Sequence, residues 1–423
     1  MATKKTVDEN DIMGLFNASM GEMLEDNAPV PYWYDWGNYA LNYICSKNLR
    51  YGLPASRIFA IQGTSGTGKS LFCCNVLRDS NIDMAFIIDT EGGGLNKELL
   101  DYAGVDISKV RILKAHTFEC YKTNKKNQVI EQVAEKDMPK KLETDQYVYT
   151  PGVTYIVKSI IDTIVYNPSL KSKKIVIILD SLGNCQSVRE IGGYDMGSRS
   201  VQIGRFFRTF DTLLNKTNIA FIFTNKLYQD INNTSMYGPT YVAAGGQSVI
   251  YNPSITIQLA ETAATDDATD ADIKKNKEGK QGAGGTSFKT LTASVIKSRF
   301  GCENRRCQIM LETATGVSRL SGLFKLLKDY GLIEQTGSYY SCKPIWGDIK
   351  FFKKDFITKF KENEDENIDK LQIALNEYEK ALREEKLKEL QESITPEDNE
   401  DSDDDVDDLV NVDSNDMISA IEK

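Results

Sequence analysis

The chain contains little of what metal centres, disulfide scaffolds and membrane anchors require. It has a single histidine, His116, and no Cys-x-x-Cys pair among its eight cysteines, so neither a zinc cluster nor a redox dithiol is expected. We interpret His116 as a loop-end or packing residue and the cysteines as reduced thiols of a buried core. No apolar run approaches the ~20 residues of a membrane helix, and the polar start at Met1 is not a signal peptide. We therefore expect a soluble, cytoplasmic protein with no membrane partner.

The chain has no excess of positive charge, and its excess of acidic residues is concentrated at the C-terminus. The formal net charge is −10 at pH 7, and residues 394–423 alone contain twelve acidic residues and one basic residue. Such a segment cannot fold against its own repulsion, so we predict a disordered acidic tail over 394–423. The remaining chain is close to neutral and is able to bind a polyanion through local basic patches.

One segment fills every position of the G-x-x-x-x-G-K-[ST] phosphate-binding loop. An apolar run at 57–62 precedes it and a helical pattern at 70–77 follows it, which is the strand–loop–helix context that this loop needs. Backbone N–H groups then face the phosphates, Lys69 reaches the β- and γ-phosphates, and the Ser70 hydroxyl ligates Mg²⁺. The sequence thus predicts a nucleotide and magnesium site formed by Gly63, Thr64, Ser65, Gly66, Thr67, Gly68, Lys69 and Ser70.

Apolar runs that alternate with helical patterns predict the fold. Runs rich in Ile, Val and Phe on both faces are typical of a parallel sheet covered by helices. We therefore expect a doubly wound α/β core. A later pair of strands, 255–259 and 288–299, separated by the polar stretch 261–287, predicts an antiparallel extension. The expected parallel strands are 57–62, 84–89, 110–113, 175–180 and 219–225.

Composition divides the chain into four regions. The first region, 1–50, contains an aromatic stretch at 28–36 that is too short to form a core of its own. We expect this stretch to pack either on this domain or on another subunit, and we predict that 1–50 is an oligomerisation segment. The ATPase core is expected over 51–340, with a polar surface excursion at 121–149. The region 341–393 is expected to be helical, and the acidic tail follows. A narrow apolar stripe in the helical region consists of Leu371, Ala374, Leu375, Tyr378 and Leu382.

Two carboxylates follow expected strands and suit the chemistry of a phosphate loop. Asp180 closes the run 175–180 and is a candidate for supporting Mg²⁺, although an aspartate there can also be a turn former. Glu91 follows the run 84–89 and precedes three glycines. It is a candidate for orienting the attacking water, and spacing alone leaves a solvated loop carboxylate as an equal alternative.

These segments resemble a known family. Residues 84–91 and 175–184 are similar to the corresponding strands of RecA-family recombinases, and the wording Asp-Ser-Leu-Gly-Asn at 180–184 is closest to the UvsX-type recombinases of large tailed phages. The similarity covers about residues 30–340, and a phage origin would place the protein in the host cytoplasm. The resemblance implies a RecA-like P-loop ATPase core, ATP as the nucleotide, and Glu91 as the base that activates water.

The resemblance also implies catalytic groups that act on a neighbouring subunit. Strand alternation puts Lys297 and Arg299 on one face. A solvated basic face is the ordinary explanation, whereas in the RecA family a basic pair at this place reaches the γ-phosphate bound by the next protomer. Lys297 and Arg299 would then stabilise charge in trans.

Two long polar loops, 186–198 and 226–247, follow the Asp180 and Asn225 strands. In RecA-like recombinases such loops line the filament axis and bind single-stranded DNA. Each single arginine or tyrosine has an ordinary surface role as its alternative, and Lys226 stands where bacterial RecA has a glutamine that senses the γ-phosphate. The candidate DNA contacts are Arg199, Arg205, Arg208, Lys226, Gly245 and Gly246, with Tyr228, Tyr237 and Tyr241 as stacking residues.

The leading hypothesis is a DNA-dependent ATPase that forms helical homo-oligomeric filaments on single-stranded DNA. It would promote homologous pairing and strand exchange with duplex DNA in recombination, repair and recombination-dependent replication. Single-strand-binding and mediator proteins would bind its C-terminal region. A hexameric replicative helicase of the RecA-like fold is the alternative, but the ~50 residues before the core leave no room for the N-terminal domain usual in that class. A non-catalytic scaffold is the third hypothesis.

Overall fold

The computed structural model describes residues 30–191, 193, 197–215, 217–235, 238–262, 288–312 and 316–394. The acidic tail, the tip of the antiparallel extension and the first 29 residues lie outside the described residues. The chain divides into two compact units, residues 1–374 and 375–423. The described part of the second unit is the C-terminal portion of one helix.

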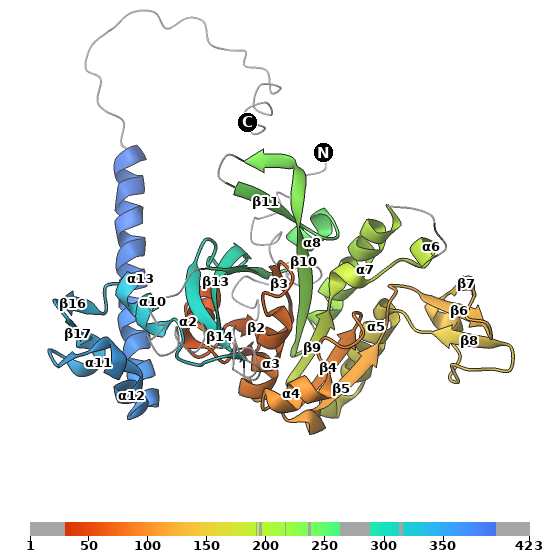
Figure 1. Cartoon of the computed structure of the whole chain (residues 1–423), viewed down its shortest axis with the longest axis horizontal. Coiled ribbons are helices and arrows are strands. Elements are labelled where there is room, and N and C mark those ends of the chain that lie inside the picture. The colour runs from red at the N-terminus through yellow and green to blue at the C-terminus, as the bar shows by residue number, and fades with distance from the viewer. Residues whose placement is uncertain are drawn as a thin grey trace, which may run out of the picture. The chain divides into compact units, whose positions relative to one another are not determined.

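A large mixed sheet forms the centre of the first unit, with the strand order β15-β14-β13-β12-β3-β10-β9-β4-β5 (Figure 1). The six strands from β12 to β5 pair in parallel, and β13, β14 and β15 add antiparallel pairs at one side. The predicted mostly parallel α/β sheet is confirmed. The strands are β3 (Arg57–Gly63), β4 (Met84–Asp89), β5 (Val110–Lys114), β9 (Ile175–Asp180), β10 (Ile219–Ser235), β12 (Ile255–Glu261), β13 (Phe288–Ser298), β14 (Arg306–Glu312) and β15 (Gly316–Val317).

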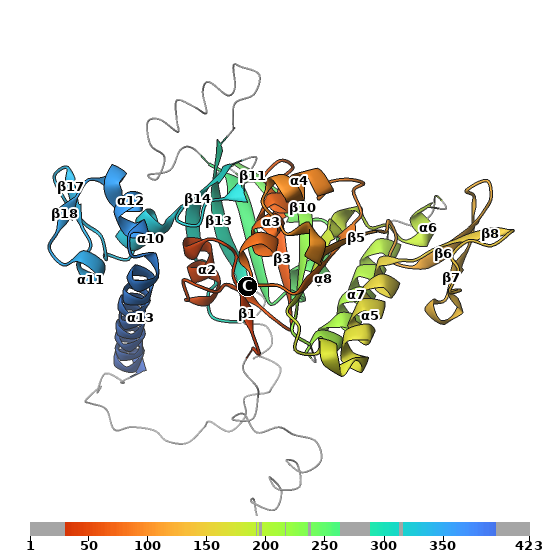
Figure 2. The same cartoon turned by 90° about the horizontal axis from the view of Figure 1, so that it is seen from below.

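Helices cover both faces of this sheet, as the doubly apolar strands require. On one face, Ile177 of β9 and Phe221 of β10 belong to a buried cluster with α5 (Val153–Tyr166) and α7 (Ser198–Leu214). Strand alternation directs the neighbouring residues, such as Ile178, to the opposite face, where α3 (Lys69–Asp79) contacts β3, β9 and β10 (Figure 2). The α4 helix (Lys97–Tyr102) follows β4 in the chain.

The start of the described chain packs on its own core. Strand β1 (Trp33–Tyr34) pairs with β2 (Leu53–Pro54), and α2 (Tyr39–Ser46) contacts β13 and β14. The Tyr34 hydroxyl donates to the carbonyl of Asn218 at 2.5 Å, and Trp36 is fully buried against Phe59. The expected boundary at residue 50 therefore divides a packed element. An oligomerisation role for residues 1–50 stays a prediction.

The expected surface excursion is a small three-stranded antiparallel sheet, hereafter the insert sheet. It contains β6 (Cys120–Asn124), β7 (Val129–Val133) and β8 (Tyr147–Thr150), in the order β7-β6-β8. The amide N–H of Phe118 donates to the carbonyl of Gln186 at 3.0 Å. The base of the insert sheet is thus tied to the segment that follows β9.

The region after the core is mixed, and not purely helical as predicted. A three-stranded sheet, β16-β17-β18, begins before the expected boundary at 340. Its aromatic residues pack with α10 and α12: the rings of Tyr340 and Phe324 meet edge to face at 5.1 Å, and those of Phe351 and Phe356 lie 5.9 Å apart. Of the expected stripe, Leu371 and Leu375 are buried and Tyr378 is 40% exposed. The elements are α10 (Leu323–Asp329), β16 (Glu334–Thr336), β17 (Tyr339–Ser341), α11 (Lys343–Trp346), β18 (Lys350–Phe351), α12 (Phe356–Lys361) and α13 (Glu364–Ile394).

The first turns of α13 contact the segment after α2 through polar side chains. The Arg50 guanidinium binds Asp365 at 2.9 Å and Asp369 at 2.8 Å, and the Gln372 side chain accepts from Leu49 N at 2.8 Å. Within the described part of the chain, none of the helices combines the length and apolarity needed to cross a membrane. All eight cysteines are buried and carry free thiols.

Candidate nucleotide site and nucleic-acid surface

Three strands, β3, β9 and β4, end at the same edge of the sheet, where β10 continues beyond it, and they bring the predicted nucleotide residues together. Asp89 at the end of β4 is in register with Asp180 at the end of β9, and Lys226 of β10 is in register with Gly63 of β3. The segment after Asp89 approaches the start of α3, since a Cβ on Gly94 would lie 4.0 Å from Ser70 Oγ. Ligands of open α/β sheets bind at this carboxyl edge.

The phosphate loop adopts a conformation that its glycines permit. Gly66 and Gly68 both have φ of 79°, and a Cβ on Gly68 would lie 2.2 Å from Leu311 Cδ2. Thr67 closes the loop by donating from Oγ1 to Thr64 O at 2.9 Å. Residues 65 and 66 are exposed at its tip.

Lys69 begins α3 and turns its ammonium back into the phosphate loop. Its Nζ donates to Gly63 O at 3.0 Å and to Thr64 O at 2.8 Å. Burial lowers the pKa of Lys69, and the carboxylates of Asp180 and Glu91 raise it only in part. A partly desolvated ammonium at the start of a helix suits a phosphate anion.

Ser70 and Asp180 form the expected hydroxyl–carboxylate pair. Ser70 Oγ donates to Asp180 Oδ2 at 2.8 Å, and Thr224 Oγ1 donates to Asp180 Oδ1 at 2.5 Å. Burial raises the pKa of Asp180, and the hydrogen bonds from Thr224 and Ser70 oppose this increase. A Cβ on Gly94 would lie 3.1 Å from Asp180 Oδ2, so glycine leaves room beside the pair. Thr224 was not predicted.

The set of oxygen atoms at this pair fits Mg²⁺. Magnesium is usually bound by one or two carboxylates or hydroxyls together with substrate phosphates and water. Among the described residues there is no cluster of three or more His, Cys, Asp or Glu side chains that could bind a metal without a substrate. The Ser70–Asp180 pair is therefore suited to a metal that arrives with a nucleotide.

Glu91 lies in the same site, where neighbouring groups fix its carboxylate. Ser181 Oγ donates to Glu91 Oε1 at 2.7 Å, and Lys226 Nζ lies 3.0 Å from the same oxygen. Burial raises the pKa of Glu91, but the hydrogen bond from Ser181 and the charge of Lys226 outweigh it, so the net shift is downward. The side chain is 29% exposed, which leaves it accessible to water.

Two residues that sequence reasoning gave no role shape the turn that carries Glu91. Asp89 Oδ1 accepts from the backbone N–H groups of Glu91 at 3.0 Å and Gly92 at 2.9 Å. Thr90 Oγ1 donates to Ser181 O at 2.7 Å and accepts from Ser181 N at 2.8 Å. The signal available in the sequence was the polar residues at the ends of adjacent strands, Asp-Thr-Glu at 89–91 and Asp-Ser at 180–181.

Lys226, a candidate DNA contact, lies beside Glu91 at the carboxyl edge of the sheet, and its contact with DNA stays a prediction. Its ammonium contacts Glu91 and lies 3.4 Å from Asn184 Oδ1. Its backbone carbonyl accepts from Ala244 N at 3.2 Å. One residue thus connects the carboxylate of Glu91 to the base of the segment expected to bind DNA.

Lys297 and Arg299 lie together, as strand alternation predicts, although β13 ends at Ser298. Both side chains donate to the C-terminal carbonyls of α8 (Gln247–Tyr251). Lys297 Nζ contacts Ile250 O at 3.1 Å and also Tyr251 O, and Arg299 contacts Tyr251 O at 3.4 Å. Within the described residues, neither side chain has a hydrogen bond to the phosphate loop of its own chain.

The second expected DNA loop is a β-hairpin, so its assignment as a loop is wrong. Strand β10 continues past Lys226 and pairs with β11 (Gly238–Ala243) in antiparallel register. Tyr228 and Tyr241 are 55% and 47% exposed, and Tyr237 lies outside the described residues. Pairing between the two strands therefore gives this segment a regular structure, where the sequence predicted an irregular loop.

The candidate glycines follow this hairpin. A Cβ on Gly245 would lie 2.7 Å from Ile203 Cδ1 of α7, so Gly245 allows close packing there. Gly246 is the N-cap of α8, which has only five residues. A contact of Gly245 or Gly246 with a DNA phosphate stays a prediction.

The candidate arginines all lie on α7, where they differ in their contacts. Arg199 forms an ion pair with Glu190 of α6 (Val188–Ile191) at 3.1 Å and donates to Gly183 O at 3.3 Å. Arg205 and Arg208 are exposed. The structure thus places Arg199 in an internal contact and leaves the other two guanidinium groups at the surface.

Comparisons with known proteins give relatives of low identity over most of the chain, and no protein-family model matches it. It is similar to the RecA protein of Borrelia hermsii, with 22% identity over 338 residues, or 77% of this chain and 78% of the relative. The RecA protein of Cereibacter sphaeroides is 21% identical over 296 residues, or 69% of each chain. That of Tropheryma whipplei is 21% identical over 314 residues, or 74% of this chain and 58% of the relative.

Proposed function

We propose that this chain is a RecA-type recombinase, a DNA-dependent ATPase that assembles on single-stranded DNA. The observation that carries the proposal is the convergence of Lys69, the Ser70–Asp180 pair and Glu91 at one edge of a mostly parallel sheet. Similarity to proteins named RecA favours a recombinase over a hexameric helicase. The short sequence at 180–184 extends the proposal to the UvsX-type subgroup of phages, with a cytoplasmic location in the host.

In this proposal ATP binds to the phosphate loop. Backbone N–H groups of residues 63–70 and the ammonium of Lys69 contact the β- and γ-phosphates, and Ser70 and Asp180 ligate Mg²⁺. The metal, when bound, neutralises charge that develops on the phosphates. The desolvation of Lys69 strengthens its attraction to that charge.

Glu91 is proposed to orient and deprotonate the attacking water. Its carboxylate is fixed by Ser181 and Lys226 and remains partly exposed, as a general base must be. Lys226 keeps the carboxylate ionised but also weakens it as a base. An anionic phosphate near Lys226 would compete for the ammonium and increase the basicity of Glu91.

A second subunit would complete the centre. We propose that Lys297 and Arg299 contact the γ-phosphate bound by the neighbouring protomer, so that ATP lies between subunits. A head-to-tail contact of this kind that does not close forms a helical filament. The N-terminal segment 1–50 is proposed to bind the next subunit, and the C-terminal region is proposed to bind helper proteins. The acidic tail is proposed to compete electrostatically with DNA phosphates and so to weaken the binding of duplex DNA.

The proposed assembly predicts helical filaments when the protein is mixed with single-stranded DNA and a slowly hydrolysed ATP analogue. Negative-stain electron microscopy of the full chain provides the measurement, and samples without nucleotide or without DNA are the controls. Closed rings would instead support the helicase. Unassembled particles under all conditions would support the scaffold and exclude the recombinase.

The contact between Lys226 and Glu91 predicts a pH effect on ATP turnover. Because Lys226 lowers the pKa of Glu91, the substitution Lys226→Met raises that pKa, and the base becomes protonated at a higher pH. The acid limb of the kcat/KM profile is therefore expected to move to higher pH. Steady-state ATPase assays across pH with saturating DNA measure this limb, and Lys226→Arg, which keeps the charge, serves as control. A limb that stays in place, or moves to lower pH, would contradict the contact.

A further inference from the structure

The antiparallel extension of the sheet also contacts the phosphate loop. A Cβ on Gly63 would lie 2.8 Å from Leu259 O of β12, and Leu311 of β14 lies against Gly68. These contacts support the start and the end of the loop. Residues 65 and 66 between them are exposed, so the tip of the loop has less support from the core.

Lys289 of β13 is the side chain that reaches this tip. Its Nζ donates to Gly66 O at 3.0 Å, and the side chain is 31% exposed. Lys289 is in register with Leu311 on β14, so two cross-strand neighbours contact the loop. Thr262 N donates to Thr290 O at 3.0 Å, which fixes the backbone beside Lys289. The contact therefore comes from a paired strand.

The position of Lys289 in its strand is unusual for a lysine. Strand alternation places it on the same face as Leu291, Ala293 and Val295, all of which are fully buried. A lysine with no role at the site would be expected on the other face, among partly exposed residues such as Thr290. Here the alkyl chain continues an apolar row, and the ammonium emerges at the phosphate loop.

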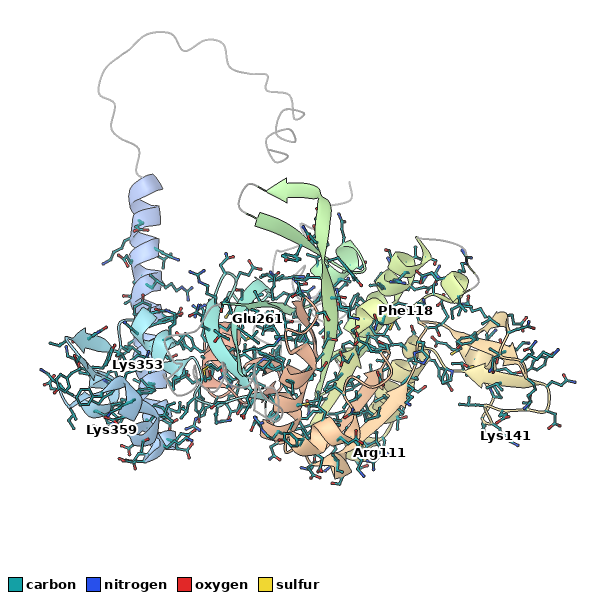
Figure 3. All side chains as sticks on the ribbon, in the orientation of Figure 1. Arg111, Phe118, Lys141, Glu261, Lys353 and Lys359 are labelled. Atoms are coloured by element: carbon teal, nitrogen blue, oxygen red, sulfur yellow. The ribbon has the colours of Figure 1, made fainter. Side chains whose placement is uncertain are left out.

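Glu261 is the acidic group beside Lys289, and its contact is the weaker one. Its Oε2 lies 3.4 Å from Lys289 Nζ, and its side chain is 58% exposed. Figure 3 shows Glu261, which lies on β12, the strand between β3 and β13. An exposed ion pair of this kind contributes little, so the ammonium keeps most of its charge for the loop carbonyl.

The contact at Gly66 fixes the orientation of one peptide group of the loop. A trans peptide is planar, and its C=O and N–H point in opposite directions. Because Lys289 binds the carbonyl of Gly66, the N–H of Thr67 is directed away from Lys289. A cation on the carbonyl also polarises the peptide, which strengthens its N–H as a donor.

We propose that Lys289 is a positioning residue of the phosphate loop, which holds the Gly66 carbonyl outward and so aims the Thr67 N–H at the phosphates of the nucleotide. Lys289 acts through the loop and does not itself touch the nucleotide. The inference rests on the proposed function, in which ATP binds to this loop, and it adds a residue that lies outside the phosphate-loop motif. A donor that is oriented in advance lowers the cost of ordering the site when the phosphates bind.

Binding of a fluorescent ADP analogue and steady-state ATP hydrolysis by the full chain test this role. For Lys289→Met, the Kd of the analogue and the KM for ATP are expected to rise about fivefold, the size of one modest hydrogen bond. The kcat at saturating ATP is expected to change less than about twofold, because the loss affects the ground state and the transition state alike. Lys289→Arg, which keeps a cationic donor, should restore most of the affinity.

Two matched variants separate the loop contact from the loss of a charge or of an ion pair. Lys325→Met removes a lysine of α10 that pairs with Asp329 at the same 3.4 Å and is 29% exposed, and it should leave Kd and KM unchanged. Glu261→Gln keeps the Lys289 ammonium and should do the same. A loss in Glu261→Gln equal to that in Lys289→Met, or no loss in Lys289→Met, would overturn the role of Lys289 alone. Failure of the unaltered chain to bind the analogue would overturn the proposed function as well.

Discussion

Lys69→Ala is expected to abolish ATP turnover while the fold stays intact. The ammonium of Lys69 is the cation inside the phosphate loop, and it already donates to two loop carbonyls. Removing one preorganised donor from a developing anionic transition state costs about 10²–10³ in rate. Because this donor also contributes to nucleotide binding, the loss should reach at least the upper part of that range. Folding is not expected to suffer, since Lys69 is desolvated by burial and alanine favours helix formation.

The measurement is ATP hydrolysis with saturating single-stranded DNA, together with binding of a fluorescent ATP analogue. Lys173→Ala is the matched control, because it removes a lysine that pairs with Asp83 at 3.0 Å. Both residues precede the N-terminal ends of β9 and β4, at the edge of the sheet opposite to the phosphate loop. Such an exposed pair contributes little to stability, and turnover should be unchanged. Normal turnover by Lys69→Ala would exclude the loop as the site of phosphate binding.

The central sheet could be predicted because its strands are buried on both faces. The runs 175–180 and 219–225 are almost wholly apolar, and residues 175–180 are all buried. The β10–β11 hairpin and the insert sheet gave no such signal, because polar residues interrupt their sequences and their strands are not buried throughout; the residues of β8, for example, are only partly buried. Residue 229, for example, is exposed although it lies in β10. Backbone pairing stabilises such strands without leaving an apolar alternation in the sequence.

The candidate nucleotide site was predictable in its chemical groups but not in its contacts. Lys69, Ser70, Asp180 and Glu91 follow from a motif and from carboxylates at strand ends. The hydrogen bond from Thr224 to Asp180 and the ion pair of Lys226 with Glu91 depend on which strands are neighbours and in what register. A single sequence does not specify that register.

Glu91→Gln is expected to retain ATP binding and lose hydrolysis. The glutamine amide has nearly the same shape and can still accept the hydrogen bond from Ser181, but it cannot take a proton from water. Loss of a positioned general base reduces the rate by about 10²–10⁴. Lys69 and the Ser70–Asp180 pair are unaltered, so nucleotide affinity should change little.

The same substitution should separate assembly from turnover. If ATP at the subunit contact stabilises the filament, Glu91→Gln filaments formed with ordinary ATP should persist as those of the unaltered protein do with a slowly hydrolysed analogue. Electron microscopy over time and phosphate release measure the two effects, with Glu98→Gln in the exposed first turn of α4 as control. Turnover that persists in Glu91→Gln would remove this residue as the base. Filaments that disassemble without hydrolysis would instead separate ATP from the subunit contact, since an intact γ-phosphate would then fail to hold Lys297 and Arg299 of the neighbouring protomer.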